Sequence, residues 1–169
     1  MGLLLALTFS LSALETALSS ALPAGVRIGL ANIVVMITLL TLGKKHALTI
    51  VILKSLFIFL TKGFSAFLMS SAGGILSFAA LVILIKSEKN SLSLISVISA
   101  LVHNMAQLVT ACFTLGSINV LWYAPVLVLA GVFAGLATGT VAGAVLPPMR
   151  KIFGKITHNQ ASGREIQRR

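Results

Sequence analysis

Residues 92–115 read LSLISVISALVHNMAQLVTACFTL, a long segment that contains no aspartate, glutamate, lysine or arginine. A helix needs about 20 predominantly apolar residues to cross a bilayer, and this segment is long enough. Its centre nevertheless carries His103, Asn104 and Gln107. In a soluble protein these three would mark the edge of a helix. Their meaning depends on the solvent around the segment, which the composition indicates.

The composition is that of a membrane protein. Of the 169 residues, 57% are hydrophobic and only 9% are charged, whereas soluble domains carry about 25% charged residues. The mean hydropathy is +1.06. A globule of this size leaves much of its surface exposed. A chain with this much apolar surface therefore requires a bilayer. The single cysteine, Cys112, excludes an internal disulfide and a multi-cysteine metal site, and we expect no cofactor or metal.

The same length criterion predicts an all-α integral membrane protein with six transmembrane helices. Lys54 interrupts the third span, and Pro147-Pro148 is expected to end the sixth, since proline cannot continue the helical hydrogen bonds. We therefore expect a transmembrane domain over residues 1–149 and a basic, disordered cytoplasmic tail over residues 150–169. The predicted spans are 3–22, 26–43, 46–61, 64–85, 92–115 and 121–146.

The distribution of positive charge predicts the orientation. With six spans, ten of the thirteen lysines and arginines fall on one side: Lys44, Lys45, Lys86, Lys89, Arg150, Lys151, Lys155, Arg164, Arg168 and Arg169. Only Arg27 and Lys62 fall on the other side. Cytoplasmic loops carry the excess of positive charge, which places both termini in the cytoplasm and the chain in the cell membrane. The net charge of +10 then reflects topology and contact with anionic lipid rather than a nucleic-acid site.

Two stripes of small residues predict close contacts between helices. Gly131, Gly135, Gly139 and Gly143 recur every four residues in the sixth span, and packing within the bundle is the simplest explanation. In the first span, Ala13, Ala17 and Ala21 form a second stripe. Glu15 lies about 200° around the helix from Ala13 and Ala17. One face of this span therefore suits a partner helix, and the other directs a carboxylate into the bundle.

Ionisable and amide side chains within the spans form the candidate substrate-binding set. Charged groups at membrane depth cost about 2.5–3.5 kcal/mol on insertion scales, so they are functional candidates by default. In one interpretation they line a polar cavity open to the outside, and the excess of cations over Glu15 favours an anionic ligand. In the other they satisfy one another, with Glu15 paired to Lys54. The set is Glu15, Arg27, Asn32, Lys54, His103, Asn104 and Gln107.

The segment SSAGGIL, residues 70–76, contains two adjacent glycines within the fourth span. In transporters, helices that are broken beside a ligand are often interrupted by glycine. Close packing of an unbroken helix against its neighbours explains the same glycines. Both interpretations stay open at the level of sequence.

Several of these segments together resemble one known family. They are ETALSSALPAGVRIGLANIV at 15–34, Gly43-Lys-Lys45, Lys54, SSAGGILS at 70–77, VHNMAQLV at 102–109 and Tyr123-Ala-Pro125. The chain resembles the Gx transporter family, also called heptaprenyl diphosphate synthase component I, from about Leu11 to Pro147. That family is grouped with the substrate-binding S components of energy-coupling factor (ECF) transporters.

The resemblance implies a six-helix S component that captures a small vitamin-like molecule from outside. Such subunits dock on a transmembrane coupling subunit driven by two cytoplasmic ATPases. In several S components the docking face is an Ala-x-x-x-Ala pattern on the first helix, which Ala13 and Ala17 match. The chain carries no Walker A sequence, as expected if ATP is hydrolysed by the partners.

The alternative is an accessory membrane subunit linked to isoprenoid or quinone-precursor metabolism. Prenyl diphosphate synthases use aspartate-rich motifs to hold magnesium, which prefers oxygen ligands. This chain contains no aspartate, so we expect no enzymatic activity of its own. A third possibility, a structural subunit without a ligand, predicts that the polar set is satisfied internally.

Overall fold

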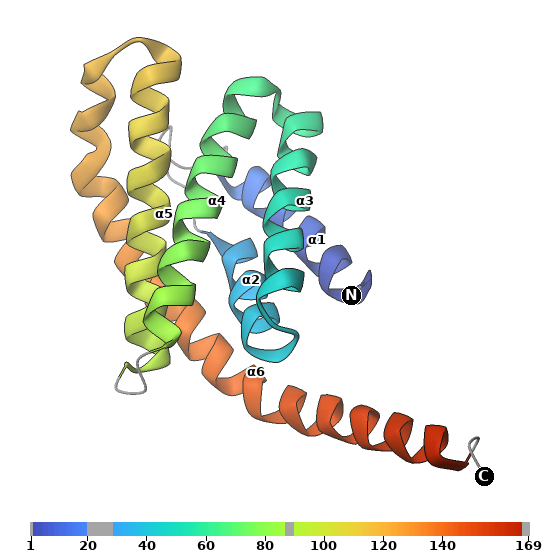
Figure 1. The fold of residues 1–169 in the computed structure, drawn as a ribbon. Coiled ribbons are helices and arrows are strands. Elements are labelled where there is room, and N and C mark those ends of the chain that lie inside the picture. The colour runs from blue at the N-terminus through green and yellow to red at the C-terminus, as the bar shows by residue number, and fades with distance from the viewer. Residues whose placement is uncertain (1, 20–28, 87–89, 167–169) are drawn as a thin grey trace.

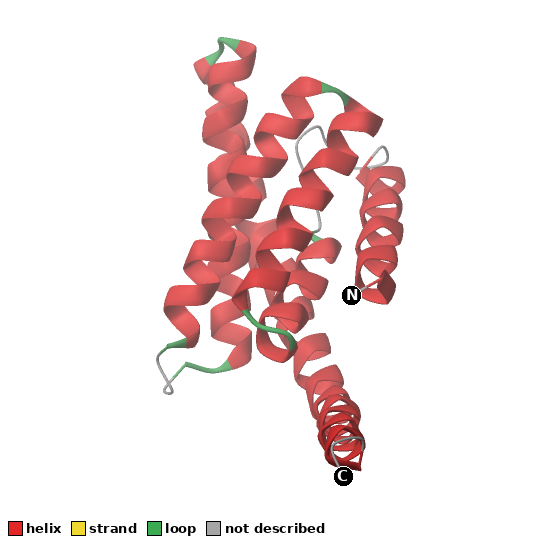
Figure 2. Ribbon diagram, turned by 45° about the vertical axis from the view of Figure 1, so that its right-hand side comes forward, coloured by secondary structure: helices red, strands yellow, loops and turns green. Residues whose placement is uncertain are grey.

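The computed structural model describes residues 2–19, 29–86 and 90–166, and within them it is helical without any strand (Figures 1 and 2). The all-helical class predicted from the sequence is confirmed. Six α-helices and one short 3₁₀ helix make up these ranges. They are α1 (Gly2–Ser19), α2 (Leu30–Thr41), α3 (Lys44–Lys62), α4 (Phe64–Ile85), α5 (Leu92–Leu115), η1 (Ile118–Tyr123) and α6 (Ala124–Ile166).

Within the described ranges, three helical segments are long and apolar enough to cross a membrane: Phe64–Ile85, Leu92–Leu115 and Ile118–Pro148. The bounds of α4 and α5 coincide with the predicted spans 64–85 and 92–115. Gly2–Ala17 and Ala31–Thr41 are apolar but shorter. In particular, α2 has 12 residues and is about 18 Å long, less than the hydrocarbon core of about 30 Å.

The predicted end of the sixth helix at Pro147-Pro148 is wrong. Helix α6 continues through both prolines to Ile166. A proline inside a helix removes one hydrogen bond and bends the axis, but the helix resumes beyond it. Figures 1 and 2 show α6 leaving the bundle and ending in a long projecting segment. The division into a domain and a disordered tail stays a prediction.

The surface of the bundle is apolar and part of its interior is polar, the reverse of a soluble protein. Phe113 and Trp122 are each 83% exposed, Phe133 is 71% exposed and Ile83 is 68% exposed. Contact of such side chains with lipid tails costs no free energy, whereas their contact with water is unfavourable. Apolar helices with an apolar outer surface therefore make this chain a membrane protein.

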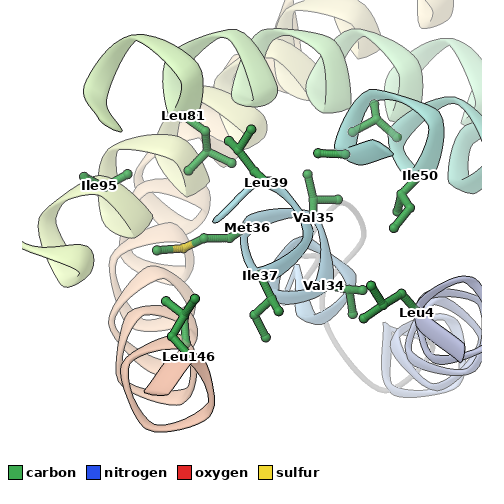
Figure 3. Close-up of a cluster of buried hydrophobic side chains, with 13 residues drawn as sticks. Leu4, Val34, Val35, Met36, Ile37, Leu39, Ile50, Leu81, Ile95 and Leu146 are labelled. Carbon is green, nitrogen blue, oxygen red and sulfur yellow. The ribbon is translucent and has the colours of Figure 1, made fainter. Parts of the chain in front are cut away.

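Helix α2 forms the centre of the apolar core. Val34, Met36 and Ile37 are almost fully buried, and Figure 3 shows them pointing in different directions toward the surrounding helices. Leu4 of α1 lies on one side of α2, and Leu81 and Leu146 of α4 and α6 lie on the other (Figure 3). A helix that is apolar all round is stable only when it is surrounded, which explains why this short helix sits in the middle.

The connections sort into two ends of the bundle. Gly63 alone joins α3 to α4, with a positive φ of 83° that only glycine adopts without strain. Figure 1 shows this turn and the α5–η1 turn at one end, and the α2–α3 turn at the other end, near the point where α6 leaves. Lys44, Lys45 and Lys86 are exposed and flank the turns of that second end.

Candidate functional site

Buried polar side chains from α1, α3, α4 and α5 gather inside the bundle. Glu15, Lys54, His103, Asn104 and Gln107 are each at least nine-tenths buried. His103 lies near the middle of α5, whose 24 residues span about 36 Å. A polar group in hydrocarbon costs several kcal/mol unless it is hydrogen-bonded. The partners of these groups therefore decide what the cluster can do.

Both ring nitrogens of His103 are hydrogen-bonded, one within α5 and the other to α4. Gln107 Nε2 donates to His103 Nε2 across 2.9 Å, so this nitrogen carries no proton. His103 Nδ1 lies 3.3 Å from Ser77 Oγ, and Ser77 Oγ donates to the backbone oxygen of Gly74 across 3.1 Å. The histidine is then neutral, with its proton on Nδ1 donated to the serine.

Gly73 explains how His103 and Gln107 fit against α4. A Cβ atom at Gly73 would lie 2.9 Å from Gln107 Cγ and 3.0 Å from His103 Cε1, and one at Gly74 would lie 2.9 Å from Val51 Cγ1. Helix α4 runs unbroken through both glycines. Of the two interpretations of this pair, close packing therefore applies and unwinding does not.

Lys54 and Glu15 each form a hydrogen bond at the start of the central helix α2. Lys54 Nζ donates to Asn32 Oδ1 across 3.0 Å. Glu15 Oε1 accepts a hydrogen bond of 2.8 Å from the backbone N–H of Gly29, the residue that precedes α2. A carboxylate is stabilised at the positive end of a helix dipole. Through these two contacts α1 and α3 both position the start of α2.

Asn104 is turned away from this group and toward α6. Its Nδ2 donates to the backbone oxygen of Leu127 across 2.9 Å. Such bonds between membrane helices contribute about 0.6 kcal/mol on average. The idea that the polar set satisfies itself thus accounts for Asn104 and Gln107.

Three small cavities surround Lys54 and Asn32. The α1-side cavity, of about 10 Å³, lies among α1, α3 and α5. The inner cavity, also about 10 Å³, lies among α2, α3, α4 and α5. The α6-side cavity, of about 20 Å³, lies among α2, α4, α5 and α6. Each has room for about one water molecule. Lys54 lines the first two cavities and Asn32 lines the last two.

Two buried hydroxyls at these cavities have no hydrogen-bond partner in the described part of the chain. They belong to Ser12, which lines the α1-side cavity, and Ser70, which lines the inner cavity. An unsatisfied buried hydroxyl costs about 1–3 kcal/mol. Neither serine belongs to the predicted polar set, and a water molecule or a ligand in the cavity would complete the bonding of each hydroxyl.

Sequence reasoning missed the serines that line the three cavities, which are Ser12, Ser55, Ser70, Ser77, Ser96 and Ser99. Their helical spacing carried a signal. Ser12 lies three residues before Glu15, Ser99 lies four before His103, and Ser70 and Ser77 lie seven apart. Residues at these spacings share a helix face. Serines in phase with buried polar residues are therefore candidates in their own right.

The other predicted residues lie outside this cluster. Arg27 and Ala21 fall outside the described residues. Ala13 and Ala17 are exposed on α1. On α6, a Cβ atom at Gly135 would lie 2.5 Å from Val97 Cα, and one at Gly139 would lie 2.6 Å from Ser93 Cα.

The remaining two glycines of that stripe differ from each other. A Cβ atom at Gly131 would lie 3.0 Å from Asn104 Nδ2, so this glycine also lies against α5. Gly143 has no atom of the described residues within 4 Å of its Cβ position. The stripe thus packs on α5 over three of its four positions.

Comparison with known proteins places most of the chain in one family. A family model described as heptaprenyl diphosphate synthase component I matches residues 4–145. This range includes all the described residues of the buried cluster. No curated protein and no solved structure matches the chain.

Proposed function

The chain belongs to the heptaprenyl diphosphate synthase component I family, and we propose that it is the substrate-binding S component of an ECF transporter. In this role it captures a small vitamin-like molecule from outside the cell. A transmembrane coupling subunit and two cytoplasmic ATPases then drive uptake. The chain itself is not an enzyme in this proposal, because it supplies binding and leaves ATP hydrolysis to its partners.

The observation that carries the proposal is the incomplete bonding of the buried cluster. Among the described residues, the hydroxyls of Ser12 and Ser70 have no hydrogen-bond partner, and both serines line cavities that Lys54 also lines. A purely structural subunit gains nothing from two unsatisfied hydroxyls in a membrane. A subunit that binds a molecule in its interior needs unsatisfied groups there, since the ligand completes their bonding.

The exposed face of α1 supports docking on a partner. Ala13 and Ala17 are exposed, while Glu15 between them is buried and points to the start of α2. Small side chains let another helix approach closely. The same helix can therefore contact a coupling subunit on one side and hold the site on the other.

Charge supports the orientation that transport requires. Lys44, Lys45 and Lys86 lie at the end of the bundle where α6 leaves. Because cytoplasmic ends carry the excess of lysine and arginine, this end faces the cytoplasm and both termini are cytoplasmic. The chain then crosses the cell membrane several times, with Trp122 and Tyr123 at the outer interface.

Replacing Ala13 and Ala17 by leucine tests the docking role. We expect the double variant to lose association with the coupling subunit while its melting temperature in detergent stays unchanged, since both positions are exposed. Co-purification measures the association. Ala79→Leu with Ala137→Leu is the matched control, because these alanines are exposed on α4 and α6. Unchanged co-purification of the Ala13/Ala17 variant would rule out this docking face.

The family description favours a second candidate function. A chain described as component I of a synthase suits an accessory membrane subunit in heptaprenyl diphosphate metabolism. Because the chain contains no aspartate, the magnesium-dependent chemistry would belong to a separate subunit. This candidate predicts a prenyl-transferring partner and no ATPases.

A further inference from the structure

The inner cavity is lined by serine hydroxyls from three helices, each at least nine-tenths buried. They belong to Ser55 of α3, Ser70 and Ser77 of α4, and Ser99 of α5. Lys54 and Asn32, which bond to each other, complete the polar lining. The volume of about 10 Å³ is close to the room that one water molecule needs. Because no bulk water reaches the middle of a bilayer, the bonding of each hydroxyl inside the bundle shows what this space can hold.

Three of the four hydroxyls already donate their proton to a backbone oxygen. The bonds run from Ser55 Oγ to Val51 O (3.0 Å), from Ser77 Oγ to Gly74 O (3.1 Å) and from Ser99 Oγ to Ser77 O (3.2 Å). A hydroxyl that donates its only proton still accepts hydrogen bonds through the lone pairs of its oxygen. The oxygens of Ser55 and Ser99 therefore present acceptors to a group in the cavity.

The fourth hydroxyl, that of Ser70, presents a donor. Ser70 is 2% exposed, and its Oγ has no hydrogen-bond partner among the described residues. A buried hydroxyl without a partner is unfavourable, so a group in the cavity should accept its proton. The same group meets the acceptor oxygens of Ser55 and Ser99 and should donate to them. A carboxylate only accepts, whereas an O–H group both accepts and donates.

We propose that the inner cavity binds one internal water molecule. The water accepts a hydrogen bond from Ser70 and donates its two protons to the hydroxyl oxygens of Ser55 and Ser99. Buried waters make about three hydrogen bonds to polar groups that otherwise lack partners, and this lining supplies that number. The water thus joins α3, α4 and α5. It does not depend on the proposed function, because a captured molecule that reached the cavity would have to replace the bonds of this water.

Thermal unfolding of the full-length protein in detergent tests the inference through the sign of one substitution. If Ser70 bonds to a water molecule, Ser70→Ala removes a hydrogen bond and should lower the melting temperature by about 2–4 °C. If the cavity is dry, the same change removes an unfavourable hydroxyl and raises the melting temperature. Ser71→Ala is the matched control on the same helix, since the Ser71 hydroxyl bonds to Phe67 O of that helix across 2.8 Å.

A crystal structure of the wild type at a resolution that reveals ordered water locates the molecule directly. We expect one isolated density peak within hydrogen-bonding distance of Ser70 Oγ, Ser55 Oγ and Ser99 Oγ. The absence of this peak, or density that extends beyond a single atom, would overturn the inference. So would a melting temperature of Ser70→Ala equal to or above that of Ser71→Ala. The proposed transport is tested separately, by the co-purification of ATPases with the wild type.

Discussion

At the scale of single residues, the protein places in its interior the groups that a membrane excludes. Gln107 and His103 are bonded to each other and to α4 through Ser77, and Lys54 Nζ donates to the amide oxygen of Asn32 at the start of α2. Buried polar groups must be paired, and the energy of an unpaired one is available for binding. The site thus consists of a bonded pair on α5 that contacts α4 and a lysine on α3 that contacts the start of α2.

Replacing both His103 and Gln107 by leucine should remove ligand binding and spare assembly. The two side chains bond to each other, so their joint replacement by apolar groups leaves fewer unpaired atoms than either single change. The melting-temperature shift caused by the ligand measures binding. Thr110→Val is the control, because the Thr110 hydroxyl bonds to Ala106 O of its own helix across 2.8 Å. A double variant that keeps its ligand-induced shift would show that this pair does not line the site.

Most of the polar set could be predicted from the sequence, but its pairings could not. Glu15, Lys54, His103 and Gln107 stand out because charged and amide groups are costly in apolar spans. The pairing of Glu15 with Lys54 stays a prediction, and the structure adds a contact of each residue with the start of α2. Those contacts depend on how three helices are arranged, and hydropathy carries no information on that arrangement.

Among the helices, packing depends mainly on how closely the backbones of neighbouring helices approach each other. Helices α5 and α6 touch backbone to backbone, since a Cβ atom at Gly135 would lie 2.5 Å from Val97 Cα. Small residues permit such contacts, in which dispersion replaces the hydrophobic effect. Gly73 does the same for α4 and α5 at the site. The glycines of this chain therefore decide where its helices meet.

Gly135→Ala should destabilise the protein by about 1–3 kcal/mol, the usual cost of overpacking. The added methyl would meet the α5 backbone, which cannot rotate away as a side chain can. Gly143→Ala is the matched control, because no atom in the described part of the chain lies within 4 Å of its Cβ position. Thermal unfolding in detergent compares the two variants. Equal melting temperatures would contradict the close contact of α5 with α6.

Helix bounds were predictable where composition changes sharply. The spans 64–85 and 92–115 were predicted to the residue, because Gly63 and the polar segment after Ile85 end the apolar pattern. The bounds of α2 and α6 were less predictable. A short apolar helix in the middle of a bundle has the composition of a spanning one, and α6 continues past two prolines because the helix can bend rather than stop.

At the scale of the whole molecule, a lipid-facing exterior encloses a polar centre, and α1 connects that centre with the outside. Its exposed alanines face away from the bundle, and Glu15 of the same helix bonds to the residue that precedes α2. A subunit that hands a ligand to a partner needs both a site and a docking face. Helix α1 thus combines a docking face with a contact to the buried site. The identity of the proteins that bind to it tests this combination.

Purification of the tagged protein from its native membranes in mild detergent, with mass spectrometry of the proteins that accompany it, tests this claim most directly. We predict that a multi-span coupling subunit and a pair of ATPases co-purify with the protein. Recovery of a soluble prenyl-transferring enzyme without ATPases would contradict it and establish the accessory-subunit alternative.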